Sequence, residues 1–204
     1  MSIRKYIFII LSLLIFVNCG GVSSGEKGEG SGSDTIVPID SVQLIKDREK
    51  ARMDSIREVA LRGDSIREMH IVVDKETCYL FLREEGKSIM EVPVCVGKGI
   101  GQKQRLGDHK TPEGVYKVKS IENSSSWPHD FRDGKGKILG AYGPWFFRLN
   151  TPQSTHIGIH GTNLPETMGM RDSDGCVRLR NEDLEQLKEY VKVGMPVVIN
   201  PDKV

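Results

Sequence analysis

His160-Gly161-Thr162, followed after a short loop by Ser173-Asp174-Gly175-Cys176-Val177-Arg178, is the stretch around which the rest of this sequence can be arranged. A cysteine is a nucleophile only as its thiolate, and a nearby imidazole can accept the thiol proton. The intervening loop is long enough to fold one side chain back on the other. Gly161 opens space beside the histidine, and Gly175 lets the backbone approach a substrate. The stretch therefore predicts a Cys–His pair in a folded domain.

The segment that precedes this histidine is typical of a strand. Ile157 and Ile159 alternate with His156 and His160. Because successive side chains of a strand point to opposite faces, we expect the isoleucines to face the core and the histidines the other face. Four residues of strand would separate the two imidazoles by about 13 Å, so they cannot both serve one cysteine. His160 is the candidate, and we expect His156 to be a surface residue.

Other runs rich in β-branched and aromatic residues also predict strands. These runs lie at residues 71–74, 77–82, 89–96, 115–119, 145–149 and 195–200. Residues 121–143 are expected to form a loop. Asn181-Glu182-Asp183 is expected to cap a helix with Leu184, Leu187 and Val191 on one face. The sequence thus predicts a mainly β fold with minor α, either a mixed β-sandwich or an open barrel-like sheet.

The N-terminus has the features of an export segment. Arg4 and Lys5 precede a near-continuous apolar run from Tyr6 to Val17, which is too short to span a bilayer and suits a signal-peptide core. Cys19 directly after this run resembles the processing site of bacterial lipoproteins. We therefore expect residues 1–18 to be a lipoprotein signal peptide and Cys19 to be lipidated, with a plain secretory signal as the alternative. Either reading predicts export, and a lipid would anchor the protein to a bacterial membrane.

A polar tether is expected between this segment and the domain. Residues 19–39 are rich in Gly and Ser, which is typical of a flexible linker. Residues 40–68 are rich in charged residues and are expected to form a solvated helical spacer, interrupted at Gly63. Residues 69–201 then form the globular domain.

The net charge bears on possible binding partners, and the cysteine content bears on possible disulfides. The chain has 204 residues and a formal net charge of +1, so nothing indicates a nucleic-acid partner. Four cysteines do not make a disulfide scaffold. Cys78 and Cys95 flank an expected hairpin and are interpreted as buried free thiols, although export also permits a disulfide. No obligate protein partner is evident.

The histidine and cysteine motifs together resemble the catalytic domain of L,D-transpeptidases, the YkuD-type family. That family has His-Gly-Thr, a loop, and then Ser/Thr-x-Gly-Cys followed by an apolar residue and Arg or Asn. The resemblance extends to Val94–Lys98, to Thr111–Gly114 and to the closing helix and strand, and it covers about residues 69–200. Asp174 departs from it, because many members have His there. Repulsion by this extra carboxylate is expected to disfavour a thiolate.

The resemblance implies both a fold and a reaction. The fold would be the mixed β-sandwich of L,D-transpeptidase catalytic domains. Cys176 would attack the carbonyl that precedes the terminal D-Ala of a peptidoglycan tetrapeptide, with His160 first as base and then as acid. The carbonyl of Gly161 would orient the imidazole, and amides around Gly175 and Cys176 would form an oxyanion hole. An acceptor amine would complete the transfer, and neither a cofactor nor a metal is implied.

Five more residues are candidates for contacts with the stem peptide. Arg178 is expected to meet a carboxylate or to brace the site. Ser173 could hydrogen-bond near the base or cap the turn, and Thr162 belongs to the histidine motif. Tyr142 and Trp145, in a Gly- and Pro-containing stretch, could line the cleft.

Other functions remain open at this point. Water instead of an amine would make the protein an L,D-carboxypeptidase or a hydrolase of cross-links. A metallopeptidase could use His156, His160 and Asp174, but the sequence lacks His-Glu-x-x-His or comparable ligand spacing. A non-catalytic lipoprotein that binds wall peptides would keep its function without the Cys176 thiol.

Overall fold

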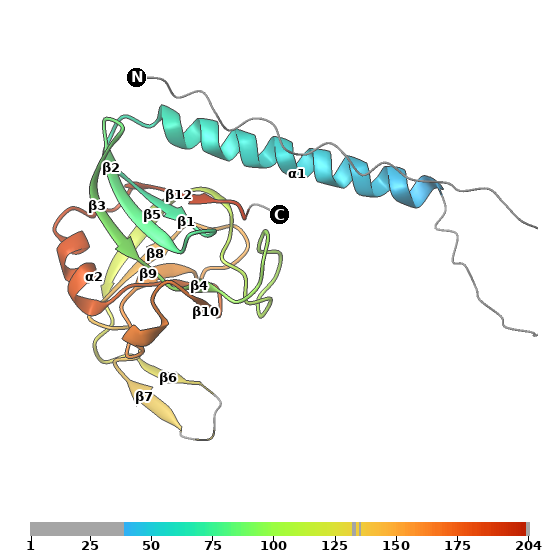
Figure 1. The fold of residues 1–204 in the computed structure, drawn as a ribbon. Helices are drawn as coiled ribbons and strands as arrows, with labels where there is room; N and C mark the ends of the chain where they lie inside the picture. Colours follow the sequence, from blue (N-terminus) through green and yellow to red (C-terminus); the bar gives the residue numbers. More distant parts are fainter. Residues whose placement is uncertain (1–38, 132–133, 135, 203–204) are drawn as a thin grey trace, which may run out of the picture. The chain divides into compact units, whose positions relative to one another are not determined.

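A computed structural model (Figure 1) describes residues 39–131, 134 and 136–202 of the chain. The expected signal peptide, Cys19 and nearly all of the expected linker lie outside the described residues. In the described part, no helix is both long enough and apolar enough to cross a membrane.

Eight strands form one mixed sheet, in the order β11-β9-β8-β5-β12-β1-β2-β3. In chain order they are β1 (His70–Asp74), β2 (Tyr79–Glu84), β3 (Lys87–Pro93), β5 (Gly114–Asn123), β8 (Trp145–Leu149), β9 (Gly158–His160), β11 (Val177–Arg178) and β12 (Pro196–Asn200). Neighbours are antiparallel except for the pairs β1–β12 and β9–β11. Two short pairs stand apart: β4 (Val96–Gly97) lies parallel to β10 (Arg171–Ser173), and β6 (Pro128–Asp130) is antiparallel to β7 (Lys137–Leu139).

The sheet is curled, as Figure 1 shows, and its inner face carries a hydrophobic core. Leu80 and Leu82 on β2 and Ile159 and Val177 near the opposite edge are all fully buried in one cluster. Strands from both ends of the sheet therefore contribute to the same interior. This arrangement confirms the predicted class, mainly β with minor α.

The central strands are buried on both faces. Val72 on β1 and Val198 on β12 are buried, yet they lie outside the main core cluster. The helix α1 (Ile39–Ser65) covers this outer face, and it contacts β12 and β5. Gly63 lies against Val198, because a Cβ at Gly63 would be 3.1 Å from a Val198 methyl carbon. The expected interruption at Gly63 is therefore wrong: the helix continues to Ser65, and the glycine permits close packing.

Within the segment 121–143, several of the described residues form strands that the sequence did not indicate. β5 continues through Asn123 and pairs with β8, and the β6–β7 hairpin follows. The expected loop is corrected accordingly. This segment is rich in Gly and Ser, which have little intrinsic tendency to form strands, so its strands form because they pair with neighbouring strands.

The remaining helices are short. α2 (Asn181–Lys188) buries Leu184 and Leu187, and the 3₁₀ helix η1 (Pro165–Thr167) follows β9. Val191 is also buried but lies beyond the end of α2. Cys78 and Cys95 are both buried with free thiols.

Candidate active site

Cys176 lies in the turn that joins β10 to β11. The buried hydroxyl of Ser173 donates to the Cys176 carbonyl oxygen at 2.6 Å and accepts from the Gly175 N–H at 3.1 Å. Gly175 has a φ of +126°, and a Cβ there would lie 2.7 Å from the Lys110 carbonyl oxygen. Both backbone conformation and space therefore require glycine at this position. We call residues 173–176 the nucleophile turn.

His160 is the last residue of β9, the strand beside β11. Parallel pairing aligns Ile159 with Val177 and His160 with Arg178. Cys176 and His160 both line one cleft of about 650 Å³. In this structure the Cys176 S–H donates to the carbonyl oxygen of His156 at 3.4 Å. The two predicted residues are thus brought to one site by neighbouring strands, while the His156 side chain is exposed.

Backbone and aromatic contacts fix the His160 imidazole. Its Nδ1 lies 2.6 Å from the Gly161 carbonyl oxygen. Because a carbonyl oxygen only accepts hydrogen bonds, this contact assigns the proton to Nδ1 and leaves Nε2 as an acceptor. Phe146 stacks on the ring with centroids 5.3 Å apart, and Tyr142 makes an edge contact at 5.0 Å. The neutral imidazole is therefore held in one orientation.

A close contact between two glycines shapes the backbone after His160. A Cβ on Gly161 would collide with Asn181 Oδ1 and would lie 2.8 Å from the Gly143 Cα. Asn181 Oδ1 also accepts the Thr162 N–H at 2.9 Å. The first residue of α2 therefore fixes the Gly161 carbonyl that orients the imidazole.

This role of Asn181 was missed in the sequence, where the residue was assigned to a helix cap. Arg180 occupies the N-cap position of α2 and makes no side-chain capping bond. The asparagine amide serves the turn after the histidine instead. The nearness of Asn181 to the glycines depends on the fold, so the residues around it in the sequence do not reveal this contact.

The resting Cys176–His160 pair is neutral. Burial raises the pKa of the Cys176 thiol to about 11, although the Gly158 backbone and nearby cations such as Lys103 act in the opposite direction. Burial also lowers the pKa of His160 to about 4, against the effect of the Gly161 carbonyl. At neutral pH the thiol keeps its proton, and Nε2 can accept one. Burial, rather than the expected repulsion by Asp174, is the largest cause of the raised thiol pKa.

Arg178 lines the cleft with a buried side chain. Its Nη2 lies 3.0 Å from Cys95 Sγ and 3.4 Å from Asp172 Oδ2. Its buried Nε has no hydrogen-bond partner among the residues that the structure describes. Leaving a buried donor unpaired costs free energy, so this nitrogen is a candidate donor to a bound anion.

Residues 98–110, which we call the cleft loop, contribute cationic and polar side chains to the lining. Lys103 is buried, and its Nζ lies 2.6 Å from Asp108 Oδ1. His109 Nδ1 lies 2.7 Å from Asp174 Oδ1, and both of these side chains are exposed. The carboxylate that departs from the family pattern is therefore engaged by the cleft loop.

The predicted substrate-binding residues differ in their placement. Tyr142 lines the cleft, with its hydroxyl 2.8 Å from His129 Nδ1. Thr162 is buried, and its hydroxyl accepts the Leu164 N–H at 3.0 Å. Like Ser173, Thr162 thus has its hydroxyl engaged within its own turn.

Trp145 lies outside the cleft lining, so that expectation is corrected. Its indole N–H donates to Glu185 of α2 at 2.9 Å, and Lys188 lies over the ring. Successive residues of a strand point to opposite faces. On β8 it is therefore Phe146 that reaches His160, and Phe146 was not a candidate in the sequence.

The metallopeptidase alternative finds no ligand set in the described part of the chain. No group of three or more His, Cys, Asp or Glu residues there could hold a metal ion. Asp174 is paired with His109, and Nδ1 of His160 faces a carbonyl oxygen.

Comparison with known proteins gives matches to one family. The model of the L,D-transpeptidase catalytic domain family, YkuD, matches residues 68–199. YkuD of Bacillus subtilis, which its name assigns to the L,D-transpeptidases, is 30% identical over 131 residues, or 64% of this chain and 65% of the relative. ErfK/SrfK of Escherichia coli, assigned by its name to the same class, is 27% identical over 169 residues, or 82% of this chain and 52% of the relative. The matches therefore span about half to two thirds of the length of these relatives.

A solved structure shares the fold. The L,D-transpeptidase from Mycobacterium smegmatis superimposes with a TM-score of 0.50 at 19% identity, covering 65% of this chain and 58% of that chain. At this level of identity the match supports the architecture alone.

Proposed function

The chain belongs to the L,D-transpeptidase catalytic domain family, and on that premise we propose that it is a cysteine-dependent acyltransferase acting on peptidoglycan stem peptides. The observation that carries the proposal is the placement of Cys176 and His160 in one cleft, with the imidazole oriented by the Gly161 carbonyl. A thiol, a base and a group that orients the base are the parts that acyl transfer needs.

In the proposed acylation, Cys176 Sγ attacks the carbonyl carbon that precedes the terminal D-Ala. Nε2 of His160 takes the thiol proton, the C–N bond breaks, and the imidazolium gives that proton to the leaving D-Ala amine. A thioester remains on Cys176. Because the resting S–H points to the His156 carbonyl, it must first turn toward Nε2.

The Cys176 N–H is our assignment for the oxyanion donor. The other expected donor, the Gly175 N–H, already donates to the Ser173 hydroxyl at 3.1 Å. One such donor contributes roughly 3–4 kcal/mol to the stabilisation of a tetrahedral intermediate. Gly175 then serves the site through its backbone conformation.

Arg178 is our assignment for recognition of a stem-peptide carboxylate. Its Nε is buried and unpaired within the described structure, whereas Lys98 and Lys103 of the same cleft are each paired with an aspartate. A guanidinium donates hydrogen bonds in a fixed plane, which suits a carboxylate. Tyr142 would contact the peptide from the cleft lining.

The second half-reaction would release the acyl group from Cys176. An acceptor amine attacks the thioester carbonyl, loses a proton to His160, and leaves a new amide and a free thiol. Water in place of the amine would give hydrolysis.

We further propose that lipidation at Cys19 anchors the exported protein to a bacterial membrane, facing the cell wall.

Intact-mass analysis with a tetrapeptide muropeptide tests the nucleophile. The wild type is expected to gain one acyl group on Cys176, whereas Cys176→Ala gains none and Cys78→Ala, the matched thiol control, gains it as the wild type does. The released products separate transfer from hydrolysis, because cross-linked dimers require an amine acceptor and tripeptides require water. Folded wild-type protein without any adduct at Cys176 would refute the proposal.

A further inference from the structure

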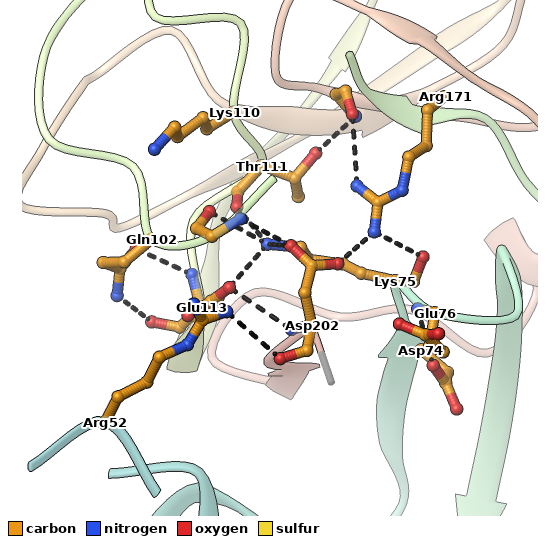
Figure 2. Close-up of polar contacts among 12 residues, drawn as sticks. Arg52, Asp74, Lys75, Glu76, Gln102, Lys110, Thr111, Glu113, Arg171 and Asp202 are labelled. Carbon is orange, nitrogen blue, oxygen red and sulfur yellow. Dashed lines mark hydrogen bonds and ion pairs between the residues drawn. The ribbon is translucent and has the colours of Figure 1, made fainter. Parts of the chain in front are cut away.

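Four charged side chains form a cluster beside the cleft loop (Figure 2), in which Lys75 and Asp202 are buried and Glu113 and Arg171 are partly buried. They are Lys75, after β1; Glu113, before β5; Arg171, on β10; and Asp202, after β12. Lys75 Nζ lies 2.8 Å from Glu113 Oε1 and 3.0 Å from Asp202 Oδ2, and the Lys75 side chain is fully buried. Asp202 Oδ1 forms a further ion pair with Arg171. We call these four residues the ion-pair cluster.

The cluster is balanced in charge and supplied with hydrogen bonds. Two cations face two anions, and Lys75 Nζ also donates to the carbonyl oxygens of Gly101 at 3.2 Å and Thr111 at 3.1 Å. Asp202 Oδ2 accepts the Gly101 N–H at 2.6 Å. Buried charges are tolerated only with such partners, and removing one partner leaves another charge unpaired. The geometry of each segment in the cluster therefore depends on the others.

The cluster holds both ends of the cleft loop. Gly101, near its beginning, is bound to both Lys75 and Asp202. Thr111 follows its last residue; its carbonyl binds Lys75, and its hydroxyl accepts the Gly97 N–H at 2.8 Å. Arg171 donates to the Gly97 carbonyl oxygen at 3.4 Å. The loop is thus fixed at its base by side chains that lie outside it.

The same loop contacts the nucleophile turn directly. The Lys98 N–H donates to the Ser173 carbonyl oxygen at 3.0 Å, and the Lys110 carbonyl oxygen lies against Gly175. Arg171 belongs to β10, the strand that leads into this turn. A shift in the cluster would therefore reach the cleft through two connected segments.

We infer that Asp202 is a positioning residue for donor binding, because its carboxylate joins Arg171 of β10 to the base of the cleft loop. The donor in this inference is the tetrapeptide of the proposed acylation, so the inference rests on the proposed function. Asp202 lies beyond the region 68–199 that the family model matches. Its carbonyl oxygen also accepts from Arg52 of α1 at 3.3 Å, so the helix before the domain is attached to the same residue.

The test compares Asp202→Asn with the conservative Asp202→Glu and with Glu91→Gln, which removes an exposed carboxylate on β3. Hydrogen exchange of residues 98–110 and 173–176 measures order without any substrate. Acylation of Cys176 by the tetrapeptide measures donor binding, and alkylation by iodoacetamide measures the thiol alone. Asp202→Asn is expected to exchange faster in both segments and to be acylated about 10- to 100-fold more slowly, while alkylation is not slowed. Asp202→Glu should recover much of the loss, and Glu91→Gln should match the wild type.

A second variant keeps the test decisive if Asp202→Asn does not fold. The double variant Arg171→Gln/Asp202→Asn removes both charges of the Arg171–Asp202 ion pair, so neither member is left as an unpaired charge. Wild-type exchange and wild-type acylation in this variant would overturn the inference. If the wild type itself is not acylated, the proposed function fails, and the exchange measurement alone then decides whether Asp202 orders the loop.

Discussion

Cys176 keeps its proton in the resting protein although it is the proposed nucleophile. Burial raises the pKa of its thiol to about 11, and burial also lowers the pKa of His160 to about 4. A stable thiolate–imidazolium pair would require these two pKa values in the reverse order. The site is therefore built to move the proton during attack on the substrate, with the imidazole already oriented to receive it.

This electrostatic state predicts the pH dependence of thiol alkylation. The rate with iodoacetamide is expected to rise from neutral pH toward the thiol pKa of about 11 without a plateau near neutrality. The reason is that the reagent consumes thiolate, whose fraction grows with pH until the pKa is reached. A plateau near neutral pH would instead reveal an ion pair with His160 and contradict the neutral resting state.

Asp174→Asn is the matched variant for this profile. The Asp174 carboxylate is exposed and engaged by His109, and burial is the largest cause of the raised thiol pKa. The variant is therefore expected to alkylate with nearly the same profile as the wild type. If the alkylation profile of Asp174→Asn moved strongly toward lower pH, repulsion by the Asp174 carboxylate would be the main cause of the raised thiol pKa.

At the scale of residues, the local sequence predicted Cys176 and His160 as a candidate nucleophile and base, and it predicted that position 175 needs a small residue. Asn181 and Phe146 were not selected, because their contacts with Gly161 and His160 exist only after distant segments meet. Trp145 was chosen for its aromatic character, whereas the alternation of β8 decides which ring reaches the histidine.

At the scale of elements, periodicity predicted the strands that carry the core. Strands β1, β2 and β12 coincide closely with apolar runs, and α2 with a helical pattern of leucines. The β6–β7 hairpin was missed, since strands of three residues are too short to show a periodic apolar pattern. Gly63 was read as a break in a helix, because intrinsic propensity does not reveal that a neighbouring sheet needs the missing side chain.

The packing of α1 on the sheet predicts that Gly63→Leu destabilises the protein. A Cβ at residue 63 would lie 3.1 Å from a Val198 methyl carbon, so a larger side chain must displace the helix or the valine. Overpacking of this kind costs about 1–3 kcal/mol in the free energy of unfolding, measurable by urea denaturation. Asp64→Leu, at the exposed neighbouring position, is the control and should not lose this stability. Equal stability of Gly63→Leu and the wild type would show that α1 does not pack on β12 in solution.

At the scale of the whole molecule, carboxylates with lowered pKa values connect segments that are distant in sequence. The Arg148 side chain, bound to Glu122 at 2.8 and 2.9 Å, holds the pKa of Glu122 at about 2 and joins β5 to β8. Burial acts to raise the pKa of Asp202, but the Gly101 N–H and the ion pairs outweigh it and hold this pKa below the ordinary value. Ionised carboxylates are therefore part of what holds the curled sheet and its loops together.

Stability should fall in acid for this reason. The folded pKa of Glu122, about 2, lies below its ordinary value of 4.5, so the unfolded chain binds the proton more readily. The contribution of Glu122 is complete above pH 4.5 and is lost as the pH falls toward about 2. Urea unfolding over this range should show that the stability difference between wild type and Glu122→Gln shrinks as the pH falls. A difference for Glu122→Gln that did not change with pH would mean that Arg148 leaves the Glu122 titration unaltered. Because Arg148 also donates to the Thr155 carbonyl ahead of β9, loss of the pair would loosen the segment that carries His160.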